Sequence, residues 1–116
     1  MTVPAGAGAL PESPPAAGTL REAGGGRYLL EGAVTMATVT ALRSAGLRAF
    51  THSKGAIEVD LSGVVRADSG ALALLIDWLA WARSARRTLK FVAPPATLLA
   101  LARLSDVEPL LLGTAG

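Results

Sequence analysis

The sequence is poor in the residues from which catalytic and metal sites are usually built. Its 116 residues include no cysteine and one histidine, His52, and only 4% of them are aromatic. The absence of cysteine excludes a disulfide framework, a thiolate metal site and a thiol nucleophile, and it is compatible with a reducing compartment such as the cytoplasm. One histidine cannot build a zinc site, and the polar stretch THSKG predicts that His52 is a solvated loop residue.

Long hydrophobic runs are also missing. The longest, ALALLIDWLAWA, is interrupted by Asp77 and is shorter than the roughly 18 residues of a membrane span, so we expect no membrane insertion. Residues 1–18 lack the basic start and apolar stretch of a secretory signal, and their Pro, Gly and Ala content predicts a disordered tail. We expect one domain over residues 19–112 and a short C-terminal tail over residues 113–116.

No nucleotide-binding or acid–base machinery is recognisable. The phosphate-binding pattern GxxxxGK followed by Ser or Thr is absent, and AGGGR opens a predicted strand where a nucleotide loop would open a helix. Glu58 and Asp60 lie on one face of a predicted strand, but nothing nearby would raise the pKa of one relative to the other. We therefore expect a protein that is not an enzyme and that holds neither a metal nor a cofactor.

The charge is nearly balanced, with a formal net charge of +2. One basic cluster stands out, formed by Arg83, Arg86, Arg87 and Lys90. Because these cations follow a predicted helix, they complement the negative end of its dipole; a surface for lipid headgroups or nucleic acid is the alternative. No aromatic side chains interleave with the charges to stack on bases, so we expect no nucleic-acid partner.

Strand and helix patterns alternate along the chain. TLREAGGGRYLLE predicts a hairpin around Gly24–Gly26. Thr35 is a candidate cap for a helix over residues 36–50, whose buried face is expected to contain Met36, Val39, Leu42 and Phe50.

The second half continues the alternation. Period-2 spacing of Ile57, Val59 and Leu61 predicts a strand with one buried face, followed by a helix over residues 70–85. RTLKFVA predicts another strand, Pro95 is expected as the first residue of the helix ATLLALARL, and VEPLLL is expected as a short helix or coil.

Together these elements predict an α/β fold. Strands separated by helices need crossover connections and are therefore parallel. We predict a mixed, mostly parallel sheet of four to five strands with helices mainly on one face.

A polar turn, Asp68-Ser69-Gly70, connects the middle strand to the following helix. Asp68 or Ser69 can accept hydrogen bonds from the free N–H groups of the first helical turn. The same position exposes the Ser69 hydroxyl at the positive end of a helix, where a phosphate or a partner's acceptor group is favoured.

The helix after this turn has an unusual distribution of apolar residues. At about 100° per residue, a core face forms from Leu72, Leu75, Ile76 and Leu79. Leu74 and Trp81 point nearly opposite and Trp78 flanks them, which predicts an exposed apolar patch typical of a protein interface. The alternative is that another segment, such as VEPLLL or the N-terminal tail, covers this face.

The run VDLSGVVRADSGALALLIDWLAWAR resembles the STAS domain family, in which a strand ending in D-L-S precedes a D-S or D-T turn, a glycine and an apolar helix. The version D-S-G-A-L-A-L-L, with LEGAVTMATV and LARLSDVEPLL, is similar to the small STAS subunits of Mla-type ABC systems, which move phospholipids between bacterial membranes and maintain outer-membrane lipid asymmetry.

This resemblance implies a non-enzymatic cytoplasmic subunit that binds and supports the transporter's ATPase. It would lie at the inner membrane through a complex that also contains permease and lipid-binding subunits. The expected partner-binding residues are Asp68, Ser69, Gly70, Leu74, Trp78 and Trp81.

The alternative is an anti-sigma factor antagonist, a branch of the family in which a partner kinase phosphorylates the serine that corresponds to Ser69 and so switches binding off. The sequence departs from that branch's D-S-S-G-L-G pattern at Gly70 and Ala71. A neighbouring gene for an ABC ATPase or for an anti-sigma kinase would distinguish the two.

Overall fold

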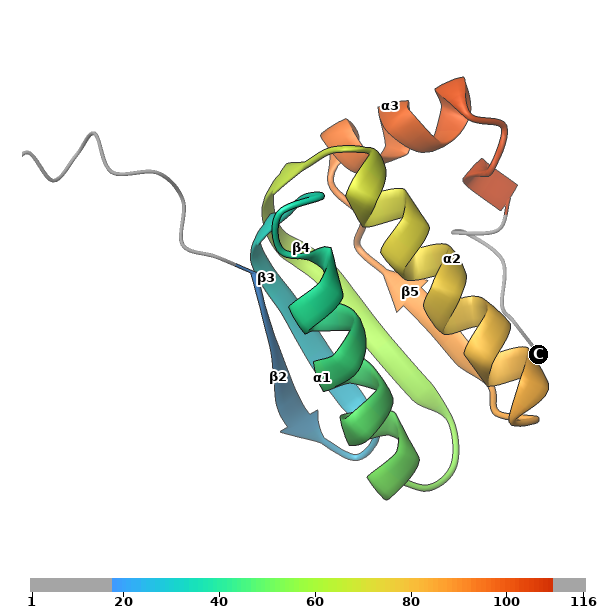
Figure 1. The fold of residues 1–116 in the computed structure, drawn as a ribbon. Coiled ribbons are helices and arrows are strands. Elements are labelled where there is room, and N and C mark those ends of the chain that lie inside the picture. Colours follow the sequence, from blue (N-terminus) through green and yellow to red (C-terminus); the bar gives the residue numbers. More distant parts are fainter. Residues whose placement is uncertain (1–17, 110–116) are drawn as a thin grey trace, which may run out of the picture.

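Within residues 18–109, four strands form one mixed sheet with the order β2-β3-β4-β5 (Figure 1). A computed structural model of the chain describes residues 18–109. The elements in that range are β2 (Thr19–Gly24), β3 (Arg27–Val34), α1 (Val39–His52), β4 (Ile57–Ala67), α2 (Ser69–Ser84), β5 (Leu89–Val92) and α3 (Ala96–Leu104).

The predicted hairpin is confirmed. Strands β2 and β3 pair antiparallel, and Gly24, Gly25 and Gly26 all have positive φ. A side chain at Gly26 would also collide with the carbonyl oxygen of Ala56, since its Cβ would lie 2.4 Å away. The positive φ angles favour glycine at all three positions, and close approach of the backbone at Ala56 additionally requires it at Gly26.

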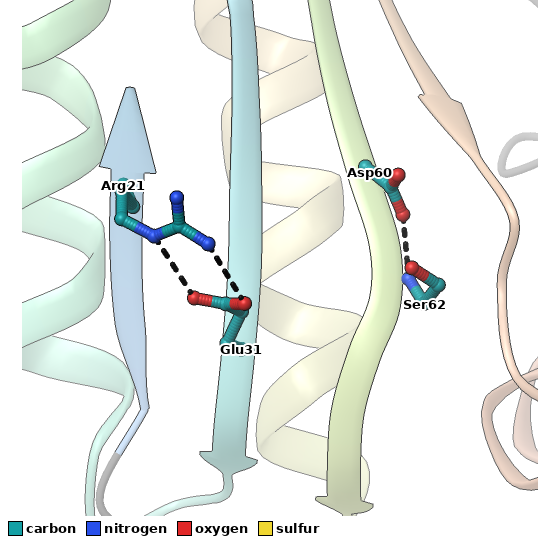
Figure 2. A network of polar contacts seen from close by, with 4 residues as sticks. All are labelled: Arg21, Glu31, Asp60 and Ser62. Carbon is teal, nitrogen blue, oxygen red and sulfur yellow. Dashed lines mark hydrogen bonds and ion pairs between the residues drawn. The ribbon is translucent and has the colours of Figure 1, made fainter. Parts of the chain in front are cut away.

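The remaining pairings are parallel, as the crossover connections predicted. Strand β4 pairs with β3 on one side and with β5 on the other. Helices α1 and α2 lie over the same face of the sheet (Figure 1). The strand side chains buried in the core are Tyr28, Leu30, Val34, Ile57, Val59, Leu61, Val64, Leu89 and Phe91. The opposite face carries polar pairs, among them Arg21–Glu31 and Asp60–Ser62 (Figure 2).

Helix α1 begins three residues later than predicted. The Thr35 carbonyl accepts hydrogen bonds from the N–H groups of Thr38 and Val39, each at 2.9 Å, and Thr38 is the residue that precedes the helix. The Thr38 hydroxyl donates to the Ala33 carbonyl at 3.0 Å. Because these threonine groups bond within the turn, residues 35–38 are not part of the helix. Met36, expected in the buried helix face, is 65% exposed.

Helix α2 is the central helix. The prediction that Leu74, Trp78 and Trp81 form an exposed apolar patch on it is wrong. Leu74 and Trp78 are both 0% exposed, and Trp81 is half-buried. The covering element is α1, since a Cβ at Gly46 would lie only 2.4 Å from the Trp78 ring. Helix α3 contacts another side of α2, so a wider part of the α2 surface is buried. Of the predicted core face, Leu72 and Leu75 are buried, whereas Ile76 and Leu79 are half-buried.

The C-terminal part of the described chain follows the prediction with one shift. Pro95 precedes α3 and is not its first residue. Val107 packs on the core and a helical turn covers residues 108–109, whereas the rest of VEPLLL and the tail at 113–116 lie outside the described residues. The predicted N-terminal tail also lies outside them, except for Gly18. None of the described helices is long and apolar enough to cross a membrane.

Candidate functional site

The turn between β4 and α2 is organised by the carboxylate of Asp68. Its Oδ1 accepts a hydrogen bond from the Gly70 N–H at 2.7 Å, which caps the helix. The same carboxylate accepts from the Met36 N–H, at 3.1 Å to Oδ1 and 3.3 Å to Oδ2. Asp68 therefore joins the turn before α1 to the first turn of α2.

Capping by Asp68 leaves the hydroxyl of Ser69 without a structural role. Ser69 is exposed, and none of the hydrogen bonds among residues 18–109 uses its side chain. The hydroxyl is thus available to a partner at the positive end of a 16-residue helix. Of the two capping residues that the sequence allowed, the structure selects Asp68.

Gly70 permits the close packing of this turn. A Cβ at Gly70 would lie 2.6 Å from the Met36 nitrogen and 2.8 Å from the Thr35 carbonyl carbon. Gly70 is buried, so its part in the site is to let two backbone segments approach each other.

Sequence reasoning missed Met36 as a site residue. Its backbone is held against the first turn of α2 by Asp68, while its side chain projects into solvent. The signal that could have found it is the series Thr35-Met36-Ala37-Thr38, whose two threonines can form turn hydrogen bonds and so delay the helix. An exposed methionine in the turn that is bonded to the start of α2 is suited to protein contact.

The buried positions of Leu74 and Trp78 remove them from any surface contact of the folded domain. The exposed residues of α2 are instead small or polar, namely Ser69, Ala73, Asp77, Ala80, Arg83 and Ser84. Asp77 pairs with Arg43 of α1 at 3.2 Å. Trp81 lies between Phe50, with ring centroids 5.7 Å apart, and the Arg87 guanidinium, 5.8 Å from its ring.

The two acids of β4, Glu58 and Asp60, interact with neighbouring side chains of the sheet. Glu58 forms ion pairs with Arg27 at 3.2 Å and with Lys90 at 3.6 Å. The pKa of Asp60 is lowered, first by hydrogen bonding to the Ser62 side chain and then by the Ser62 N–H (Figure 2). Burial opposes this shift, and the nearby Arg27 charge lowers the pKa further. A carboxyl with a lowered pKa is ionised at neutral pH and does not serve as a general acid.

The histidine lies in a helix and not in the expected loop. His52 is the last residue of α1, is exposed, and its Nδ1 lies 2.7 Å from the Arg48 carbonyl oxygen. It lines a hollow of about 350 Å³ with Glu22, Tyr28 and Arg48, remote from Ser69. No group of three or more His, Cys, Asp or Glu side chains suited to a metal ion occurs in residues 18–109.

A solved structure with a similar fold is the one described as "Structure of the Anti-Sigma Factor Antagonist SpoIIAA in its Unphosphorylated Form". The two superpose with a TM-score of 0.64 over 80% of this chain and 84% of that one, at 16% sequence identity. At this identity the match defines the class of fold, a STAS-like α/β domain.

The family is identified by comparison of the sequence with a family profile. The family profile described as "Mlab, STAS domain" matches residues 22–113, so the chain belongs to that family. The resemblance noted from the residues is thereby confirmed at the level of the family. No match was found among curated proteins.

Proposed function

We propose that this chain is the small STAS subunit of an Mla-type ABC phospholipid transporter, where it binds and supports the ATPase. The observation that carries the proposal is the match to the Mlab STAS family over residues 22–113. In this function the chain supplies a surface and performs no reaction. It would lie on the cytoplasmic side, held at the inner membrane through the complex with permease and lipid-binding subunits.

The contact surface we propose is centred on the first turn of α2. Ser69 offers an exposed hydroxyl, and Met36, whose N–H is bonded to Asp68, offers an exposed apolar side chain. Asp68 and Gly70 act indirectly, because the Asp68 carboxylate and the missing Gly70 side chain hold the two turns together. Methionine adapts its shape to a partner's groove, so Met36 is suited to anchor the contact.

Trp81 is a peripheral member of this surface at most. It lies twelve residues after Ser69, which corresponds to about 18 Å along the helix axis. A partner that touches both residues must cover most of the length of α2, where Ala73 and Ala80 permit close approach.

A second function is favoured by one observation. An anti-sigma factor antagonist needs a serine that a kinase can reach, and the Ser69 hydroxyl is exposed and unused. Phosphorylation would add a charge of about −1.5 to −2 beside the Asp68 carboxylate and would disrupt an interface by repulsion and desolvation. The fold shared with SpoIIAA is compatible with this function.

Co-purification separates the two functions. The tagged full chain should retain an Mla-type ATPase, and Met36→Asp should lose it because the new carboxylate would be buried against the partner. Leu104→Asp is the matched control, since Leu104 is 85% exposed at the end of α3 and its substitution should leave binding intact. Retention of an anti-sigma kinase in place of the ATPase, with ATP-dependent phosphorylation of Ser69, would support the second function instead.

We also propose that the chain alone neither binds nor hydrolyses ATP, since it lacks a phosphate-binding loop. Saturable heat on titration of ATP into the purified chain would contradict this.

A further inference from the structure

Five basic residues gather at the end of the molecule where α1 and α2 finish, and we call this surface the basic pole. Arg48 lies near the end of α1 and Lys54 in the loop after it. Arg83 lies in the last turn of α2, and Arg86 and Arg87 follow it. Figure 1 shows the C-terminal ends of both helices at the same end of the sheet.

Hydrogen bonds join the loop after α1 to the loop after α2. The Ile57 N–H donates to the Thr88 carbonyl at 2.8 Å. The Arg87 guanidinium donates to the Gly55 carbonyl at 3.0 and 2.9 Å and to the Phe50 carbonyl at 3.1 Å. The Arg87 guanidinium therefore uses its donors within the fold. The other four cations lie at exposed positions around it.

The positive charge of the pole is not neutralised within the described chain. The ion pairs of residues 18–109 involve none of the five cations. Glu58 is paired with Arg27 and Lys90. Glu22 lines the same hollow as Arg48 and is counted here against the five cations. This leaves four positive charges in excess, against a net charge of +2 for the whole chain, so the rest of the protein carries a net charge of −2.

The helix dipole accounts for only part of this cluster. Its effect falls off within the last turn of a helix, and Arg83 is the basic residue in that turn of α2. Lys54 and Arg86 lie beyond the helices, and Arg48 lies a turn before the end of α1. The helix dipole therefore does not explain these three cations.

We propose that the basic pole binds an anionic membrane surface through its lipid phosphates. The described large apolar side chains that are exposed are Met36, Val65 and Leu104, all outside the pole. A protein interface normally has an apolar or aromatic centre, and single-stranded nucleic acid needs stacking aromatics. An anionic bilayer needs neither, because juxtamembrane cations contribute through the surface potential alone.

The inference does not depend on which partner binds Ser69. The basic pole and Ser69 are at opposite ends of α2, whose 16 residues span about 24 Å. A membrane at one end and a protein at the other can therefore be bound together.

The test is co-sedimentation of the full chain with vesicles of equal parts phosphatidylcholine and phosphatidylglycerol. Binding is expected, and it should weaken as salt shortens the screening length from about 10 Å at 0.1 M to about 3 Å at 1 M. Each neutralised cation should weaken binding about fivefold, which corresponds to about 1 kcal/mol, so Lys54→Gln with Arg83→Gln should lose about 25-fold. The pair Arg48→Gln with Arg86→Gln should lose as much.

Arg66→Gln with Arg103→Gln is the control, since it removes the same charge from exposed sites away from the pole. It also breaks the ion pair of Arg103 with Glu108, so Arg66→Gln alone is measured beside it. Both should bind as the wild type does, and all variants should keep their melting temperatures. The proposal is overturned by equal binding to pure phosphatidylcholine, by no binding, or by an equal loss in the control pair. Tighter binding of duplex DNA in the same buffer, lost in the pole variants, would assign the surface to nucleic acid and also overturn it.

Discussion

Replacement of Gly46 by alanine tests whether Trp78 belongs to the core between α1 and α2. In an exposed helix this change would stabilise the protein by about 0.5 to 1 kcal/mol, because glycine loses more backbone freedom on folding. Here the new Cβ would lie 2.4, 2.5 and 2.6 Å from three atoms of the Trp78 indole. Normal carbon contacts are about 3.5 to 4.0 Å, so the ring or the helix must move by about 1 Å.

The surroundings of Trp78 resist that movement. The ring is 0% exposed and stands edge-to-face on Phe50, with centroids 5.3 Å apart and planes at 78°. No hydrogen bond to another described residue anchors its Nε1, so the resistance comes from packing alone. Overpacking of this kind costs about 1 to 3 kcal/mol. After the propensity gain, Gly46→Ala should lower the free energy of unfolding by up to about 2.5 kcal/mol.

Urea denaturation followed by circular dichroism measures this change. In a Trp78→Leu background the same Gly46→Ala change should be neutral or stabilising, which gives a coupling energy within the 0.5 to 3 kcal/mol typical of residues in contact. Ser44→Ala, at an exposed position of α1, controls for helix propensity and should stabilise slightly, by about 0.5 kcal/mol or less. Stabilisation by Gly46→Ala in the wild-type background would show that Trp78 does not pack there.

Three further predictions concern polar groups. Asp68→Ala should lower stability by about 1 to 2 kcal/mol, measured by thermal melting, and Asp68→Asn should lose less because it still accepts a hydrogen bond. Since the pKa of Asp60 is lowered in the folded state, its stabilising effect is present above the unfolded pKa and is lost as pH falls through the folded value. Urea titrations should therefore find that Asp60→Asn differs most from the wild type near neutral pH and converges with it below about pH 4; a constant difference would contradict the lowered pKa. Arg87→Ala should destabilise by about 2 kcal/mol, and Arg87→Lys should restore only part, because a lysine cannot reproduce the planar fork that reaches Gly55 and Phe50 together.

The local patterns predicted the strands and the order of the elements well. Three successive glycines can hardly continue a strand, so Gly24–Gly26 identified the hairpin. Alternation at Ile57, Val59 and Leu61 predicted which side of β4 is buried. These features depend on residues close in sequence, where backbone preference and period-2 burial act directly.

A helical wheel with one buried face could not predict which side chains of α2 are buried. The wheel assumes one buried face, whereas α2 contacts the sheet, α1 and α3. Two signals were present in the sequence. Residues 71–82 are apolar almost all around the helix, which is typical of a buried helix, and Gly46 inside a helical pattern indicates a close approach.

The Asp68-Ser69-Gly70 turn was predicted correctly as the junction of β4 and α2. The sequence did not decide whether Asp68 or Ser69 caps the helix. Which side chain caps the helix depends on Met36, which is distant in sequence and offers its N–H to Asp68. Only the tertiary arrangement shows that Ser69 is left exposed.

The central claim is that Ser69 is a contact residue for a partner and not part of the fold's framework. Calorimetric titration of wild type, Ser69→Ala and Ser69→Asp into the Mla-type ATPase, with melting curves of each, tests it most directly. Both variants should melt near the wild-type temperature, since Asp68 provides the cap. Ser69→Ala should bind more weakly, and Ser69→Asp should lose binding, because an unpaired buried carboxylate costs several kcal/mol. Equal affinity of all three proteins would contradict the account.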